Sequence, residues 1–233
     1  MKLKAILPMA TGNFDEPAKA LLSKHCAQGT TVDISHLEAG VIINESRYDD
    51  ALNIPHIIKI AEKAQEDGFD GVFIDCFMEP GLVAIRESLT IPVVGAARMS
   101  MYYSAELAHS FSIITPIDRG IVDTKDTVLK LGLMDKLASI HSLKLSLANM
   151  PSFENLQELI LNKAIEAIEN YDAHLILLGC AAWVGFEDYL KYQLSQKGYN
   201  VPVLSPIVAF KYLENLVSLG LAHSKRTYMS PSK

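Results

Sequence analysis

One pattern occurs twice in this chain: a short apolar strand that ends in a cysteine and is followed by another apolar strand. The first copy spans Gly71 to Gly95 and reads GVFIDCFMEPGLVAIRESLTIPVVG, with Cys76 close behind its strand. The second copy begins with AHLILLGCAAW, in which Cys180 ends the strand, and continues to VPVLSP at Val201. An internal repeat constrains a fold strongly, because each copy must form the same supersecondary unit.

The repeat extends to the start of each half. KAILPMATG from Lys4 matches SIITPIDRG from Ser112. The offset between Pro8 and Pro116 is 108 residues, and the offset between the two cysteines is 104. Because these offsets are so similar, we infer a duplicated α/β unit with one cysteine at the same address in each half.

Apolar runs and amphipathic segments alternate along both halves, which predicts parallel sheets flanked by helices. We predict strands at 2–7, 30–34, 71–74, 91–94, 111–115, 139–143 and 201–204. A further strand, before the last of these, ends at Cys180. Helices are predicted at roughly 16–26, 50–67, 82–89, 99–109, 121–131, 155–170, 183–196 and 208–219, the first two capped by Asp15 and by Asp49 or Asp50. The expected fold class is α/β, with two pseudo-symmetric four-stranded parallel-sheet domains, each a three-layer αβα unit.

The domain boundaries follow from the repeat and from the last helix. We expect a first lobe at 1–97 plus 206–233 and a second lobe at 98–205, with the active site in the cleft between them. The C-terminal helix, residues 208–219, is assigned to the first lobe, because it follows the last strand of the second half and has nowhere else to pack. The segment 38–48 is long for a connection in a compact α/β unit, which indicates a functional loop.

Composition excludes several classes of protein. The chain has 233 residues, of which 49% are hydrophobic, so it can bury a substantial core. Its formal net charge of −6 argues against nucleic acid or an anionic membrane as a partner. Three cysteines without close spacing indicate neither a disulfide framework nor a zinc site, and the first apolar run is too short for a signal peptide. We therefore expect a cytoplasmic protein with no metal.

Each cysteine could have a structural role or a chemical one. A buried cysteine is often only a small hydrophobic residue, and we interpret Cys26, at a helix end, in that way. Cys76 and Cys180, however, stand where parallel strands end, which is where open sheets bind ligands. A nucleophilic cysteine needs a histidine base, and none of the seven histidines stands beside either cysteine, although His36 is the best placed.

Two symmetric thiols suit proton transfer instead. One thiol, as thiolate, removes a proton from a carbon, and the other returns a proton to the opposite face. The carbon is inverted without a cofactor. The reverse reaction requires the thiols to exchange roles, and a duplicated fold supplies two similar environments.

The chain resembles the aspartate/glutamate/hydantoin racemases, and within them the hydantoin and allantoin racemase branch. The resemblance covers nearly the whole chain. It is carried by INESRYDDAL from Ile43, DCFMEPGL from Asp75, AIRE from Ala84, IPVVG from Ile91, FSIIT from Phe111, LLGCA from Leu177, VPVLSP from Val201 and LGLAHSKRTYMSP from Leu219.

Carried over residue by residue, the resemblance implies that Cys76 and Cys180 are the two catalytic acid/bases. It also implies that the flanking residues hold the substrate through backbone amides; these are Phe77, Met78, Gly179 and Ala181. Thr115 would donate or accept a hydrogen bond to the substrate, with helix capping as the alternative role. Pro8 and Met9 complete the expected substrate-binding set.

The chain departs from the family's usual pattern at four places beside the expected site. Pro8-Met9-Ala10 replaces an asparagine-proline-asparagine turn, and Arg98 stands where a glutamate is common. Ser205 replaces a common aspartate, and Ala182-Trp183 replaces a smaller pair. We expect Arg98 or Trp183 to shape a substrate preference unlike that of an ordinary hydantoin racemase.

The expected function is that of a cofactor-independent racemase or epimerase acting on amino acids and derivatives such as hydantoins. The expected partners are a small-molecule substrate and further copies of the chain in a homo-oligomer. Sibling chemistry on the same scaffold stays open, either maleate cis-trans isomerisation with two cysteines or arylmalonate decarboxylation with one. A non-catalytic small-molecule-binding protein is the third alternative, which the presence of both cysteines disfavours.

Overall fold

The computed structural model describes residues 1–149 and 151–232, which divide into two compact units. The first unit comprises Met1–Ala96 and the residues from Ala209 onward, and the second comprises Ala97–Val208. Each unit contains one four-stranded sheet in which every pair of neighbouring strands is parallel. The predicted α/β fold with two parallel sheets is confirmed.

The sheet of the first unit has the strand order β2-β1-β3-β4. Its strands are β1 (Lys2–Ile6), β2 (Thr31–Ser35), β3 (Gly71–Ile74) and β4 (Val93–Gly95). The connecting elements are η1 (Gly12–Phe14), α1 (Asp15–His25), α2 (Arg47–Glu66) and α3 (Leu82–Ser88). Because side chains alternate along a strand, Val72 and Ile74 of β3 face Ile57 and Ala61 of α2 in one buried apolar cluster.

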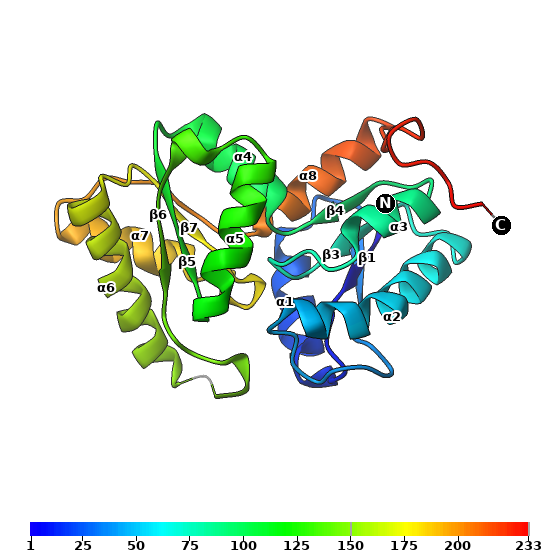
Figure 1. Cartoon of the computed structure of the whole chain (residues 1–233), viewed down its shortest axis with the longest axis horizontal. Coiled ribbons are helices and arrows are strands. Elements are labelled where there is room, and N and C mark those ends of the chain that lie inside the picture. Colours follow the sequence, from blue (N-terminus) through cyan, green and yellow to red (C-terminus); the bar gives the residue numbers. More distant parts are fainter. Residues whose placement is uncertain (150, 233) are drawn as a thin grey trace. The chain divides into compact units, whose positions relative to one another are not determined.

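The opposite face of this sheet is covered by α8 (Ile207–Ser218), the last helix of the chain, which is drawn in orange in Figure 1. The Phe73 ring meets the Phe210 ring edge to face, with their centroids 5.5 Å apart. At Gly71 the helix comes so close that a Cβ atom would lie 2.9 Å from Leu213 Cδ1. The sheet is therefore covered on both faces, and β3 and β4 are apolar without alternation for that reason.

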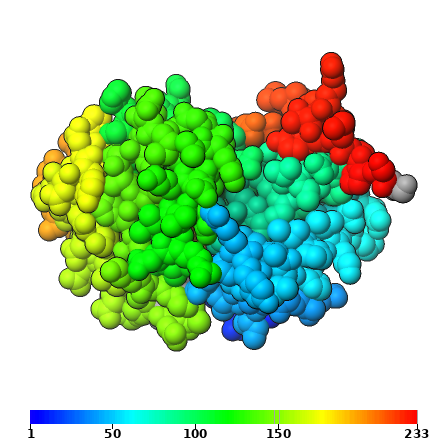
Figure 2. Space-filling model, in the orientation of Figure 1, coloured from blue at the N-terminus to red at the C-terminus, as the bar shows by residue number. Residues whose placement is uncertain are grey.

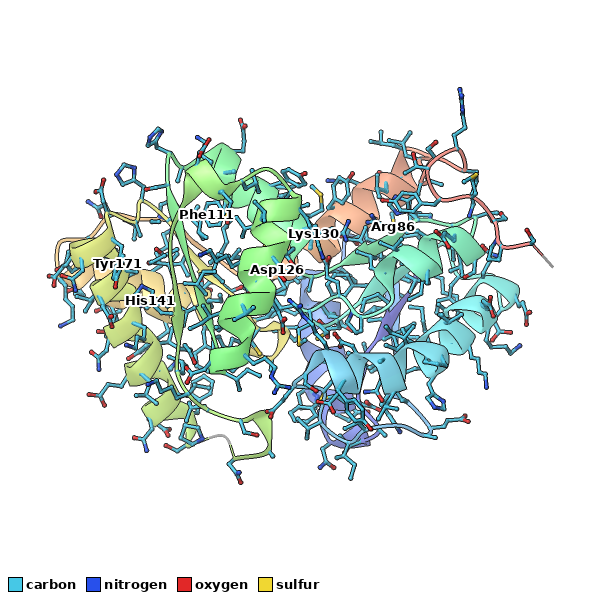
Figure 3. All side chains as sticks on the ribbon, in the orientation of Figure 1. Arg86, Phe111, Asp126, Lys130, His141 and Tyr171 are labelled. Carbon is cyan, nitrogen blue, oxygen red and sulfur yellow. The ribbon has the colours of Figure 1, made fainter. Side chains whose placement is uncertain are left out.

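The second unit repeats this topology with the strand order β6-β5-β7-β8. Its strands are β5 (Phe111–Thr115), β6 (Leu137–Ser142), β7 (Ile176–Leu178) and β8 (Val203–Leu204). Its helical elements are α4 (Arg98–Leu107), α5 (Asp118–Lys130), η2 (Met134–Lys136), η3 (Leu147–Asn149), α6 (Phe153–Tyr171), η4 (Ala181–Trp183) and α7 (Glu187–Gln196). On the edge strand, His141 packs against Tyr171 of α6 with ring centroids 5.1 Å apart (Figure 3). The equivalent strand orders confirm the repeat.

Three local predictions are wrong. The N-cap of α2 is Ser46, whose hydroxyl accepts from the amide of Asp49, so neither Asp49 nor Asp50 caps this helix. Asp15 is the first residue of α1 rather than its cap, because the preceding turn forms η1, capped by Thr11. The helix predicted at 183–196 is interrupted, since the chain leaves helical geometry at Val184 and Gly185, the latter with φ of +99°.

The segment after α8 returns along the first unit and covers the open edge of its sheet. His223 Nε2 lies 3.1 Å from the amide nitrogen and 2.7 Å from the carbonyl oxygen of Val93 in the edge strand β4. Arg86 of α3 donates to the Tyr228 hydroxyl, and Lys225 donates to carbonyls at the end of α3. Figure 2 shows this red segment lying against the neighbouring surface, and Figure 3 labels Arg86. The segment satisfies backbone groups that an edge strand would otherwise present to other chains.

We expect His223 to make the protein acid-sensitive. Burial, together with the positive charge of Arg86, lowers the pKa of His223 to about 4. Between pH 6.5 and 4 the unfolded chain binds a proton that the folded chain does not, so the free energy of unfolding falls as the pH falls. The effect should be on the order of 1 kcal/mol, because the ring is partly exposed to solvent. Melting curves at pH 7.5 and 5 should show a smaller acid loss for His223→Gln; an identical loss would contradict this assignment.

Candidate active site

Cys76 stands just beyond the carboxyl end of β3. The amide of Asp75 donates to the carbonyl of Ile6 over 3.0 Å, which is the last bond between β3 and the central strand β1. The amide of Cys76 then turns back to the carbonyl of Ile74, and its own carbonyl accepts from the amide of Glu79 over 3.1 Å. Cys76 is half-buried and opens a tight turn at the edge of the sheet where ligands bind in parallel α/β folds.

The same turn carries two of the predicted substrate-binding residues. Phe77 and Met78 occupy its middle positions, and both are half-buried. Glu79 closes the turn with φ of +51°, a left-handed conformation that is uncommon for a residue with a side chain. Gly81 then caps α3, which begins at Leu82.

Pro8 and Met9 lie at the same edge of this sheet, in the loop that follows β1. Both are buried. The carbonyl of Pro8 accepts from Asn53 Nδ2 over 3.0 Å, and the carbonyl of Met9 accepts from the amide of Leu37. Asn53 is fully buried in α2, and its Oδ1 accepts from the amide of Val41, so it ties the β1 loop to the long loop before α2. No sequence pattern indicates this role of Asn53.

Cys180 occupies the equivalent position in the second unit, beyond the carboxyl end of β7. The amide of Gly179 donates to the carbonyl of Ile114 over 2.7 Å, so that N–H is already used within the sheet. A Cβ atom on Gly179 would lie 2.8 Å from the same carbonyl oxygen, which explains the glycine. Cys180 is 7% exposed and packs in an apolar cluster with Trp183 and Phe186.

Ala181 and Thr115 complete the predicted set in this unit. Ala181 is the first residue of η4, which Cys180 caps in an extended conformation. Thr115 ends β5 and is 4% exposed, and its hydroxyl lies against Gly120 in the first turns of α5. The structure thus brings Thr115, Cys180 and Ala181 to one edge of the second sheet, as it brings the other predicted residues to one edge of the first.

Trp183 lies in the core of the second unit. Its side chain is fully buried and shares an apolar cluster with Cys180. Its replacement by glycine would therefore remove a core side chain, a change that typically costs about 3–5 kcal/mol. Arg98 is half-buried at the start of α4. The expected role of Arg98 or Trp183 in substrate preference stays a prediction.

Two titratable groups lie near Cys76: Asp75, which the sequence analysis did not single out, and His36, which it named only as the best-placed histidine. Asp75 directly precedes the thiol; although its side chain is not fully covered, the protein around the carboxyl group raises its pKa to about 7 by desolvation. His36 follows β2 at the same edge of the sheet, and its Nδ1 lies 2.7 Å from Asp15 Oδ2. Among residues 1–149 and 151–232, no group of three or more His, Cys, Asp or Glu side chains is arranged to hold a metal ion.

The model of the Asp/Glu/Hydantoin racemase family matches residues 5–210. The chain belongs to this family. A hydantoin racemase from Pseudomonas sp. (strain NS671) is 32% identical over 236 residues, which cover 100% of this chain and 93% of that protein.

Solved structures agree with the family assignment. An allantoin racemase from Klebsiella pneumoniae superposes with a TM-score of 0.92 at 29% identity, covering 100% of this racemase-family chain and 94% of that one. A variant of Nocardia farcinica maleate cis-trans isomerase with a covalently bound succinylcysteine intermediate has a TM-score of 0.64 at 14% identity, over 94% and 93% of the chains. The last similarity shows a shared fold alone. No helix in the described parts of this family member has the length and apolar character needed to cross a bilayer.

We expect Asp75 to reverse the usual dependence of stability on pH. Between pH 3.8 and 7 the folded chain holds a proton on Asp75 that the unfolded chain has released. The free energy of unfolding therefore falls as the pH rises through this window. Asp75→Asn should stabilise the protein at pH 8 by on the order of 1 to 2 kcal/mol and have less effect at pH 5. Chemical denaturation at both pH values measures this, and equal effects at the two would contradict it.

Gly179 should tolerate no side chain. In Gly179→Ala the new Cβ would meet the carbonyl oxygen and a side-chain methyl group of β5, which are held by the sheet. Overpacking of this kind costs about 1–3 kcal/mol. The control is Ala182→Gly, which changes a neighbouring exposed position without crowding it. Gly198→Ala would not serve as a control, because φ of +88° at Gly198 is itself unfavourable for alanine. A melting temperature unchanged by Gly179→Ala would contradict the close approach.

Proposed function

We propose that this protein is a cofactor-independent racemase or epimerase in which Cys76 and Cys180 are the two acid/base groups. The observation that carries the proposal is the matched position of the cysteines. Each follows the third strand of its sheet by two residues, since β3 ends at Ile74 and β7 ends at Leu178. Each preceding residue donates its amide to the central strand. A reaction with two interchangeable proton donors requires two groups at equivalent structural positions.

The proposed reaction inverts a carbon next to a carbonyl group. The thiolate on one side removes the proton, and the electron pair left on carbon is delocalised into the adjacent carbonyl. The thiol on the other side then delivers its proton to the opposite face of the same carbon. The protein ends with the thiol and thiolate exchanged, which prepares it for the reverse direction. Both sulfurs must come within contact distance of that carbon.

The proposed substrates are hydantoins or other cyclic and open amino-acid derivatives. Support comes from the similar proteins named above, one a hydantoin racemase and one an allantoin racemase. Their substrates share a stereocentre between a carbonyl carbon and a nitrogen, whose proton is acidic enough for a thiolate to remove. Optical rotation measured over a panel of 5-substituted hydantoins, allantoin and amino acids would identify the substrate.

Single cysteine variants should separate the two half-reactions. Cys76→Ser and Cys180→Ser should each lose racemisation by several orders of magnitude, because an alcohol is too weak an acid at neutral pH. In heavy water each variant should still exchange deuterium into one enantiomer only, the one whose proton faces the remaining thiol. Mass spectrometry of each enantiomer after incubation measures this directly.

Cys26→Ser is the matched control, because Cys26 is a half-buried thiol at the end of α1. Burial raises the pKa of Cys26, and the variant should racemise and exchange both enantiomers as the native protein does. Full racemisation by Cys180→Ser would exclude the two-thiol mechanism. A stable covalent adduct between Cys76 or Cys180 and a maleate-like substrate would instead indicate the sibling isomerase chemistry.

A further inference from the structure

Each cysteine loop is followed by a glutamate that reaches the end of the neighbouring strand. In the first unit this strand is β4, which ends at Gly95, and in the second it is β8, which is followed by Ser205. Gly95 and Ser205 are equivalent in the repeat, since both lie three residues after the prolines of IPVVG and VPVLSP. Each unit therefore places a carboxylate at the equivalent position, the end of the strand that neighbours the cysteine strand.

In the first unit the carboxylate is that of Glu79. Its side chain lies so close to Gly95 that a Cβ atom there would stand 2.5 Å from Glu79 Oε1 and 2.6 Å from Cγ. Gly95 is buried, and Glu79 is only 8% exposed. The absence of a side chain on Gly95 is what gives the carboxylate its position across the end of β4.

Glu79 adopts this position at an energetic cost. Its φ of +51° is unfavourable for a residue with a Cβ atom, by about 1 kcal/mol or more. The backbone is fixed on both sides, because the Glu79 amide donates to Cys76 and its carbonyl accepts from Leu82. A glutamate held in a left-handed conformation three residues after a thiol indicates a functional constraint.

In the second unit the equivalent carboxylate is that of Glu187, the first residue of α7. One of its oxygens accepts from the Ser205 hydroxyl, and the other accepts from the amide of Gly185. Ser205 is fully buried. Glu187 thus fastens the segment that follows Cys180 and η4 to the end of β8, with a serine donor where the first unit has Gly95.

We propose that Glu79 and Glu187 are matched positioning residues, each holding one cysteine loop against the adjacent strand of its own sheet. This inference rests on the proposed two-cysteine function. Neither carboxylate is assigned a proton-transfer step; each acts through the loop that carries the thiol. Because each glutamate belongs to a single unit, its loss should affect one thiol and therefore the exchange of the proton of one enantiomer.

The test uses Glu79→Ala and Glu187→Ala, with Glu79→Gln and Glu187→Gln as conservative variants. Glu214→Ala is the matched control, since Glu214 is a buried glutamate on α8 that accepts from the amide of Ala27, away from both loops. The first readout is the rate at which iodoacetamide alkylates Cys76 and Cys180, resolved by peptide mass spectrometry. The second is deuterium exchange into each enantiomer of the best substrate found in the panel.

Glu79→Ala should change the alkylation rate of Cys76 and the exchange of one enantiomer on the order of tenfold or more, since small displacements of reacting groups have effects of this size. Glu187→Ala should do the same for Cys180 and the other enantiomer. The Gln variants should recover part of each loss. Glu214→Ala should alter both thiols and both enantiomers equally, if at all.

A second pair of variants acts from the opposite side of each contact and guards against unfolding of the alanine variants. Gly95→Ala should reproduce the effect of Glu79→Ala, because its methyl group would displace the carboxylate, and Ser205→Ala should reproduce that of Glu187→Ala. Melting curves identify the variants that remain folded. Equal changes at both thiols in all four variants, or no change at either, would overturn the proposal. Should the cysteine variants show that the proposed function is wrong, the alkylation rates still decide the positioning role.

Discussion

The position of each thiol depends on one backbone hydrogen bond at the end of a central strand. The amide of Asp75 meets the carbonyl of Ile6 in the first unit, and the amide of Gly179 meets the carbonyl of Ile114 in the second. Each bond is the last of a parallel ladder, so the next residue leaves the sheet at a fixed height and direction. A slip of one residue would place a side chain at the positions of Gly71 and Gly179, where neighbouring atoms leave no room for a Cβ atom, and this fixes the register beside each cysteine.

The two thiols have equivalent backbone positions but different side-chain environments. Beside Cys76 stands a carboxyl group that is half-protonated near pH 7. Cys180 instead lies within an apolar cluster with Trp183 and Phe186. The glycine at position 179 is required by the close approach of β5, whereas position 75 has room for a side chain. The duplication therefore preserved geometry more strictly than environment, and the two directions of proton transfer need not be equally easy.

Most of the sheet architecture could be predicted from the sequence, because the repeat and the apolar runs encode parallel strands directly. Helix starts were less predictable, since Ser46 and the acidic residues after it are all good capping candidates and only the geometry selects Ser46. The burial of Trp183 was not predictable, because a position close after a cysteine does not show which way a large side chain packs. The role of Glu79 depends on a positive φ and on the space at Gly95, which are tertiary properties that no local pattern shows.

The first unit is discontinuous in sequence, since α8 and the segment after it complete a sheet that began at residue 2. The ribosome therefore exposes the whole second unit before it has made the helix that covers Phe73 and the histidine that covers Val93. Until then, the nascent first sheet lacks its cover over Phe73 and has an open edge on β4, the form in which β-strands associate with other chains. The half that was started first is thus the last to be fully covered.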